Sequence, residues 1–427
     1  MKKQLATSNG CYTLVGESLT MTILWRRRTA KEWIRLAATP LLCLCCIYAG
    51  VAQNRSHNTV TPAYRIDLKS VFKADATPQL STRETPWVPV ITLNFIDNNT
   101  LAATFVVPAK AKPEFAARGK EDDASPFRLE SAIFEASSGK VLATPEWPTN
   151  SRAAGIVTAN DRGFVVETGD QLVLLSSELV SLKQFKLPVC PVNGVNAQSS
   201  SWRPDPSWSG NRVLLASGEV WSQKCRLWVD AETMQVLASW QDGKVGSIAV
   251  SDDQVVMQAF QRHYGDPPVP LERAAPGGNW KAIAGTQGAS APQFLGPHLL
   301  YFQSLPANSP AVKPGVFLMR TDTGTVSQLD SPQQGWGFGR AVPARNGDRF
   351  VILITDVKGS HAALDISGHS VVTGIDVYDA PYRSASYSLT VRQSQVRNAS
   401  AAISPDGRHL AILGYPKPIL EIFELPR

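Results

Sequence analysis

The stretch AAISPDGRHLAIL at residues 401–413, followed by ILEIFEL at residues 419–425, decides the predicted fold. Its centre, Ser404-Pro405-Asp406-Gly407, is typical of a tight turn, because Pro presets φ and Gly accepts a positive φ. Apolar residues alternate on both sides of this turn, as expected for half-buried strands. The stretch therefore predicts two antiparallel strands joined by a tight turn, with a third strand after them.

The same unit recurs along the chain in degenerate form, and its third strand often ends in a turn similar to Asp-x-x-Thr-Gly. Turn centres lie near residues 97, 161, 209, 252, 296, 347 and 406. The six intervals cover 309 residues, a mean of about 51, close to the length of a four-stranded propeller blade, about 40–50 residues. We therefore predict an all-β chain folded as a single β-propeller of seven four-stranded blades. Six or eight blades also fit, whereas tandem β-sandwiches are disfavoured because neither half shows its own start and finish.

The ring is predicted to close through a strand from the N-terminal side. The last unit supplies three strands before Arg427, and Ala63–Leu68 is strand-like but has no local partner. We expect this segment to be the outer strand of the last blade, which removes an exposed edge. A Pro-, Ala- and Lys-rich segment near residues 108–127 is predicted to be a loop insertion, and residues 265–278 a second loop; both are expected to contact a partner.

Residues 1–52 have the pattern of an export leader. Arg26–Arg28 precede an apolar stretch at residues 36–52, which ends with the small residues Gly50 and Ala52. A basic region, an apolar core and a small-residue exit are typical of a secretory signal peptide. We therefore expect residues 53–427 to be the exported propeller domain, located in the periplasm or outside the cell.

Three alternatives concern the leader. The apolar stretch is shorter than the roughly 20 residues of a membrane span and contains Pro40, so an uncleaved signal anchor is less favoured than a cleaved peptide. A lipoprotein is disfavoured, because Leu or Cys rather than a small residue precedes each cysteine between residues 43 and 46. Met21 is an alternative start of translation. A membrane contact is expected only through an uncleaved leader.

The net charge of +6 comes mainly from the leader. Residues 1–52 contain seven of the 42 Lys and Arg and two of the 36 Asp and Glu, which leaves 35 basic and 34 acidic residues. A nearly neutral domain lacks the basic surface of a nucleic-acid-binding protein. We therefore predict no nucleic-acid partner.

Two cysteines, Cys190 and Cys225, lie outside the leader. In an oxidising compartment they are candidates for a disulfide. Two unrelated buried thiols are the alternative, because a sequence does not supply the geometry that a bridge requires.

The Ile403–Ala411 turn motif resembles the WD40-like and YVTN-type β-propeller repeats of bacterial exported proteins. The resemblance extends as an architecture over residues 60–427, but the Gly-His and Trp-Asp signatures of true WD40 repeats are absent. It implies a fold and little chemistry, since propellers include lactonases, peptidase gates, quinoprotein dehydrogenases and scaffolds.

Motifs for catalysis, metal or cofactor are not found. The six histidines show no zinc-ligand spacing, although His361 and His369 would approach each other across a hairpin. No Gly-x-Ser-x-Gly motif or phosphate-binding glycine loop is present. Residues 335–339 are Gly-rich but lack the rest of such a loop. We expect these glycines to let Trp336 and Phe338 reach a blade surface or the channel mouth. We predict no metal and no cofactor, and the catalytic residues are unknown.

Aromatic and acidic residues offer the remaining candidates. Five Trp fall within 39 residues, from Trp202 to Trp240. We favour packing of these rings between blades over a platform on which a ligand stacks. In the alternative, the candidate binding-face aromatics are Trp202, Trp208, Trp336 and Phe338. We expect the acidic residues of the turns to accept hydrogen bonds from their own backbone. In the alternative, some of them come together around the axial channel as a metal or acid/base site. These acids are Asp97, Asp161, Asp253, Asp348 and Asp406.

The sequence therefore favours a non-catalytic, exported propeller that presents its loops to a protein or polysaccharide partner in the cell envelope. The alternative is a propeller enzyme, such as a lactonase or a quinoprotein-type dehydrogenase, acting at the central channel. A third interpretation is a sensor or gate module for a separate catalytic protein. Converging polar side chains with a metal would favour an enzyme, and an apolar plug in the channel would favour a scaffold.

Overall fold

The computed structural model divides the chain into residues 1–55 and a compact unit of residues 56–427. The predicted leader lies outside the described residues, and no helix within the described part is long and apolar enough to cross a membrane. The structure describes residues 61–72, 91–108, 127–149, 154–188, 202–217, 224–242, 246–259, 269–304, 315–329, 336–356, 371–380, 385–390, 400–414 and 418–426.

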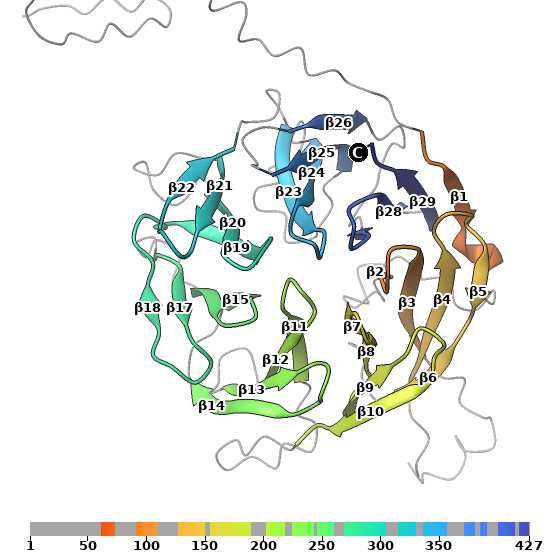
Figure 1. Cartoon of the computed structure of the whole chain (residues 1–427), viewed down its shortest axis with the longest axis horizontal. Helices are drawn as coiled ribbons and strands as arrows, with labels where there is room; N and C mark the ends of the chain where they lie inside the picture. The colour runs from red at the N-terminus through yellow and green to blue at the C-terminus, as the bar shows by residue number, and fades with distance from the viewer. Residues whose placement is uncertain are drawn as a thin grey trace, which may run out of the picture. The chain divides into compact units, whose positions relative to one another are not determined.

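Seven antiparallel sheets form a ring in the second unit, with the first strand of each blade nearest the centre (Figure 1). Blades 1 to 3 are, from the inside outward, β2 (Thr92–Phe95), β3 (Thr100–Pro108), β4 (Phe127–Glu135) and β5 (Val141–Ala143); β7 (Gly155–Asn160), β8 (Gly163–Glu167), β9 (Gln171–Leu175) and β10 (Ser181–Lys186); β11 (Trp202–Pro206), β12 (Arg212–Ser217), β13 (Lys224–Asp230) and β14 (Val236–Asp242).

The remaining blades continue the ring. Blades 4 to 6 are β15 (Gly246–Val250), β16 (Val255–Ala259), β17 (Glu272–Ala274) and β18 (Lys281–Ala282); β19 (Ala289–Phe294), β20 (Leu299–Ser304), β21 (Gly315–Arg320) and β22 (Val326–Gln328); β23 (Trp336–Pro343), β24 (Arg349–Asp356), β25 (Val371–Asp379) and β26 (Tyr387–Thr390). Blade 7 is β27 (Ser400–Ile403), β28 (His409–Gly414), β29 (Ile419–Glu424) and β1 (Tyr64–Asp67).

The predicted architecture is confirmed. Each of the seven predicted turn centres lies in, or at the edge of, the connection between the first and second strands of a blade. Blade 1 carries one irregularity: its outer position is shared by β5 and β6 (Glu146–Thr149), which both pair with β4. Pro145 lies between the two, where a residue without an amide hydrogen suits a break in the ladder.

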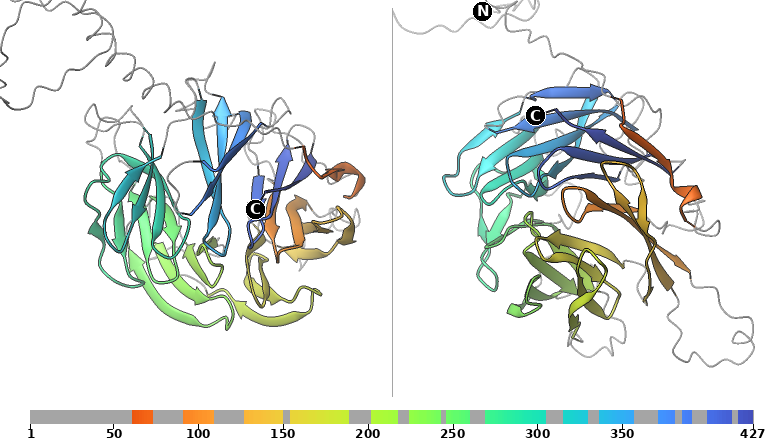
Figure 2. Two further views of the ribbon diagram at one scale, coloured as in Figure 1. Left: turned by 45° about the horizontal axis from the view of Figure 1, so that its top comes forward. Right: turned by 45° about the vertical axis from the view of Figure 1, so that its right-hand side comes forward.

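The predicted closure is also confirmed. β1 pairs antiparallel with β29, with Tyr64 opposite Ile422 and Ile66 opposite Leu420, and lies beside blade 7 in Figure 2. The chain continues into a short 3-10 helix, Leu68–Ser70, whose Leu68 is only 1% exposed. Leu68 packs in a cluster with residues of blades 1 and 7, so one short segment joins the two ends of the ring.

Apolar clusters between neighbouring blades form the core. One contains Leu318 of β21 with Ile352 and Ile354 of β24, across the seam of blades 5 and 6. Because each middle strand packs against blades on both of its faces, its buried residues form continuous runs; all five residues of β8 are buried.

The two predicted loops differ in outcome. Residues 109–126 lie outside the described residues, but the chain leaves at Pro108 and returns at Phe127, which are cross-strand partners, so the insertion connects two adjacent strand ends. The prediction for residues 265–278 is wrong in part, because Glu272–Ala274 forms strand β17 and Leu271 is fully buried. The short strand, bounded by Pro and Gly, resembled a loop in the sequence.

We predict that Leu68→Ala lowers the free energy of unfolding by about 2–5 kcal/mol, because it empties a buried site between blades 1 and 7. Chemical denaturation followed by Trp fluorescence measures this. Leu142→Ala is the matched control: Leu142 is 52% exposed on β5, and its loss should change stability by less than about 0.5 kcal/mol. Equal effects of the two substitutions would contradict the closure role of Leu68.

Candidate functional site

One end of the propeller is built from the turns that join the first and second strands of the blades. We call them the inner turns and this end the turn face; Figure 1 shows these turns toward the centre of the ring. The inner turns are residues 96–99, 161–162, 207–211, 251–254, 295–298, 344–348 and 404–408.

Each of five inner turns is held by the end of the third strand in the same blade. There a backbone N–H donates to an inner-turn carbonyl over 2.6–3.0 Å. The pairs are Ala136 to Asn99, Ala231 to Asn211, Thr321 to His298, Ala380 to Asp348, and Leu425 to Arg408. This repeated bond fixes the inner turns on the sheets below them, so the turn face is a rigid platform.

Short polar side chains shape the turns. In blade 7 the Ser404 hydroxyl donates to Asp406 and accepts the backbone N–H groups of Arg408 and His409, while Gly407 adopts φ of +72°. The Asp97 carboxylate in blade 1 accepts two backbone N–H groups of its own turn. The predicted backbone-bonding role is confirmed for Asp97 and Asp406.

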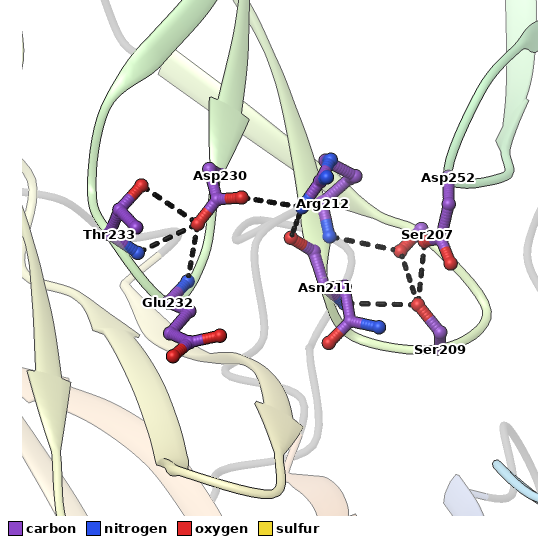
Figure 3. Close-up of polar contacts among 8 residues, drawn as sticks. All are labelled: Ser207, Ser209, Asn211, Arg212, Asp230, Glu232, Thr233 and Asp252. Carbon is purple, nitrogen blue, oxygen red and sulfur yellow. Dashed lines mark hydrogen bonds and ion pairs between the residues drawn. The ribbon is translucent and has the colours of Figure 1, made fainter.

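Figure 3 shows the polar contacts that fix the inner turn of blade 3 and join it to Asp252 of blade 4. The Ser209 hydroxyl donates to Asp252 of the next blade over 2.6 Å. Arg212 pairs with Asp230 at 2.6 Å, and Asp230 also accepts bonds from Thr233. Although burial opposes it, the bonds from Thr233 and the charge of Arg212 lower the pKa of Asp230. The carboxylate therefore stays ionised and fixes this turn.

Hydrogen bonds between turns link neighbouring blades. They join Gln254 to Thr321 (blades 4 and 5), the N–H of Asn346 to Pro405 O (blades 6 and 7), and the N–H of Asp406 to the Asn98 side chain (blades 7 and 1). An ion pair joins Arg162 to Glu232 (blades 2 and 3). The turn face is therefore continuous around much of the ring.

Two side chains join turns that are not neighbours in the ring. The Trp208 ring of blade 3 lies against Gly347 of blade 6, 3.7 Å from the position a Cβ would take there. Arg345 of blade 6 passes blade 7 and donates its Nη2 to Ile96 O of blade 1 over 2.8 Å. Burial lowers the pKa of Arg345, and the charges of Asp161 and Asp97 oppose this shift. Turns from blades 1, 2, 3 and 6 thus gather at the ring axis.

Three of the turns in contact here each hold a buried N–H without an acceptor among the described residues: Asn160 Nδ2, Trp208 Nε1 and Arg345 Nη1. Asn160 is 5% exposed and follows Ala159, whose carbonyl touches the blade 3 turn at Gly210. Buried donors are nearly always paired in folded proteins, and one without a partner costs about 1–3 kcal/mol. We call these residues the donor triad.

The inner turns are acidic. They contain six carboxylates and three arginines, whereas the whole chain has more basic than acidic residues. The six are Asp97, Asp161, Asp252, Asp253, Asp348 and Asp406. A pocket of about 280 Å³ lies between blades 6 and 7 on this face, lined by Asn346, Asp348, Arg349, Asp379, Asp406 and Arg408.

Of the predicted binding-face aromatics, only Trp208 lies on the turn face. Trp202 is 3% exposed and donates its indole N–H to Pro188 O, so it is a core residue between blades 2 and 3, which corrects the expectation for it. Trp336 and Phe338 lie on β23 at the end away from its inner turn, and their side chains lie outside the described part of the chain.

The described Trp residues of the Trp-rich stretch pack between blades, as expected. Arg226, 1% exposed, donates to both oxygens of Asp242 at 2.8 and 3.0 Å. Trp240 and Trp280 donate their indole N–H groups to the same carboxylate at 3.1 and 3.3 Å. Asp242 therefore joins blade 3 to blade 4 and compensates a buried guanidinium.

Cys225 is disulfide-bonded and 8% exposed. It packs in the cluster that contains Trp202 and Leu187. Cys190, three residues beyond Leu187, is the only other cysteine outside the leader but lies outside the described residues. The Cys190–Cys225 pairing therefore stays a prediction.

No group of three metal-binding side chains occurs among the described residues, and His361 and His369 lie outside them. Asn160 and Arg345 were not singled out from the sequence. Both stand in ordinary turn sequences, Asn-Asp-Arg-Gly and Arg-Asn-Gly-Asp, and only the ring brings these turns against the turn that contains Trp208.

Comparisons with known proteins support the β-propeller fold and identify no family. No family model and no curated protein matches the chain. Among solved structures, the Pan2 WD40 domain of Neurospora crassa is 11% identical, covers 87% of this chain and 97% of its own, and has a TM-score of 0.50. The chain has the β-propeller fold. Two further propellers score lower: that of the Trilobed protease from Pyrococcus furiosus (8% identity; 78% and 95% covered; TM-score 0.48) and the C-terminal WD40 domain of Sif2 (13%; 80% and 98%; 0.42).

We predict that peptide mapping without reduction yields a linked Cys190–Cys225 peptide. Cys225→Ala should lower the free energy of unfolding by about 2–4 kcal/mol, because the bridge restricts the unfolded chain. Reductant should destabilise the unsubstituted protein by a similar amount and leave Cys225→Ala unchanged. Free alkylation of Cys190 before reduction would contradict the pairing.

A buried carboxyl predicts a pH effect. Glu167 at the end of β8 is 1% exposed, and burial, reinforced by Asp170, raises its pKa from 4.5 to about 7. The folded state thus favours the protonated acid, so its penalty is absent below pH 4.5 and grows to about 3 kcal/mol above pH 7. Glu167→Gln should raise stability by up to this amount at pH 8 and by little at pH 5.

Urea denaturation at the two pH values measures the effect of Glu167→Gln. Glu424→Gln, at an exposed position at the end of β29, is the control and should change little at either pH. A Glu167→Gln variant with the same pH dependence as the unsubstituted protein would contradict the prediction.

Proposed function

We propose that this chain is an exported β-propeller that binds a protein partner in the cell envelope through its turn face. The observation that carries the proposal is the meeting of turns from blades 1, 3 and 6 at the ring axis, through Arg345 and Trp208. Bonds within and between blades hold this face, while carboxylates such as Asp348 stay exposed on it. A rigid platform with exposed charged loops suits recognition of a macromolecule.

The described Trp residues favour a protein over a polysaccharide. Sugar recognition by stacking uses exposed aromatic faces, but none of the six Trp whose side chains are described is exposed. Trp202 and Trp228 are 3% and 2% exposed, and Trp240 and Trp280 bond Asp242. The acidic inner turns instead suit a partner with basic residues.

Export is supported by the leader pattern of residues 1–52 and by the disulfide at Cys225, because such bonds persist mainly in oxidising compartments. The same compartment is where a partner is expected.

Site-specific photo-crosslinking in the native cell envelope tests this proposal. A photoreactive residue replaces Asp348 or Arg408, both exposed on the turn face, and the controls carry it at Gln184 on β10 or Ser239 on β14, exposed on outer strands. We expect one discrete protein adduct from the turn-face positions and none from the controls.

Adducts only from the outer strands would move the interface to the edge of the blades, and no adduct at any position would overturn the protein-binding proposal. Leader cleavage is checked on the same samples by N-terminal peptide mapping, where an intact residue 1–52 segment would contradict processing.

A further inference from the structure

We propose that the donor triad receives a loop of the partner protein, with the loop's main-chain carbonyls accepting the three N–H groups and a Lys or Arg side chain pairing with Asp97 and Asp161. This inference rests on the proposed protein-binding function and adds which chemistry the turn face recognises.

The first argument is the unmet hydrogen bonding. Asn160, Trp208 and Arg345 come from blades 2, 3 and 6, and each holds one buried N–H without an acceptor among the described residues. Three such donors destabilise the free protein more than one does. A partner that supplies acceptors recovers this cost, which favours binding at the ring axis over any other part of the face.

The second argument is the charge around the donors. Arg345 carries one positive charge, and Asp97 and Asp161 lie close enough to act on its pKa. Both carboxylates are exposed, so the region has an excess negative charge facing solvent. A carboxylate or phosphate ligand would be repelled by it, whereas a neutral carbonyl satisfies the donors and a nearby cationic side chain satisfies the acids.

The third argument concerns how a partner loop reaches the three N–H groups. The three N–H groups are closed to water in the free protein, so a loop reaches them only if the Trp208 ring shifts. That ring is half-buried, lies beside Gly347 and packs against the apolar cluster between blades 4 and 5, so its shift breaks these contacts and binding must compensate for them. Ala159, Gly210 and the sheet hydrogen bonds beneath stay in place, so the rearrangement involves the side chain and leaves the blades intact.

The test uses a phage library of random nine-residue cyclised loops, panned on the purified chain. We expect enriched loops to carry Lys or Arg at a fixed position. A synthetic representative should bind Trp208→Phe, which keeps an aromatic side chain and removes the N–H, at least about tenfold more weakly. Asp161→Asn should weaken binding of the same loop, and more at low salt than at high salt.

Asp322→Asn is the matched control, because Asp322 lies outside the inner turns, in an exposed pair with Arg320, and it should bind the loop like the unsubstituted chain. Thermal unfolding of each variant confirms that the fold is kept. Loops without a basic residue, loops that bind Trp208→Phe and Asp161→Asn unchanged, or no enrichment at all would each overturn the inference. If Asp348 still crosslinks a partner protein in those cases, only this inference fails and the proposed function stands.

Discussion

The pairing of β1 with β29 is the constraint on which the other features of the ring depend. A propeller blade is stable only when both of its faces are covered, and blades 1 and 7 cover each other only if the chain ends are joined. Four cross-strand pairs and the buried Leu68 make that join. The inner turns meet at one axis because the ring is closed, so the turn face depends on a segment far from it in the sequence.

Buried polar groups divide into two kinds in this protein. Asp242 receives four N–H bonds from Arg226, Trp240 and Trp280, and its charge is fully used in joining blades 3 and 4. Asn160, Trp208 and Arg345 each keep one donor unused at the ring axis. Buried side-chain atoms without a partner among the described residues also occur within the blades, as at Ser217 and Ser304. The position at the inner turns, and not the missing bond alone, therefore supports the proposed interface.

The turn face also shows how one local motif serves two purposes. Ser404, Asp406 and Gly407 fix the blade 7 turn by bonds within it, and the backbone N–H of Asp406 bonds Asn98 of blade 1. The same short polar residues that form a turn therefore supply the contacts between blades. Their carboxylates remain at the surface as a consequence, which gives the face its acidic character.

The sequence by itself determined the strand and turn order and the closing strand and favoured seven blades over six or eight, because each follows from local alternation and turn chemistry repeated at regular spacing. It did not separate Trp202, which is buried between blades 2 and 3, from Trp208, which is half-buried, packs against the cluster of blades 4 and 5 and also reaches Gly347. It also missed Asn160 and Arg345, and it mistook β17 for a loop. Only the closed ring decides which turns meet, because the contacts of Gly210 with Ala159 and of Gly347 with Trp208 arise from the packing of seven sheets and not from any pattern along the chain.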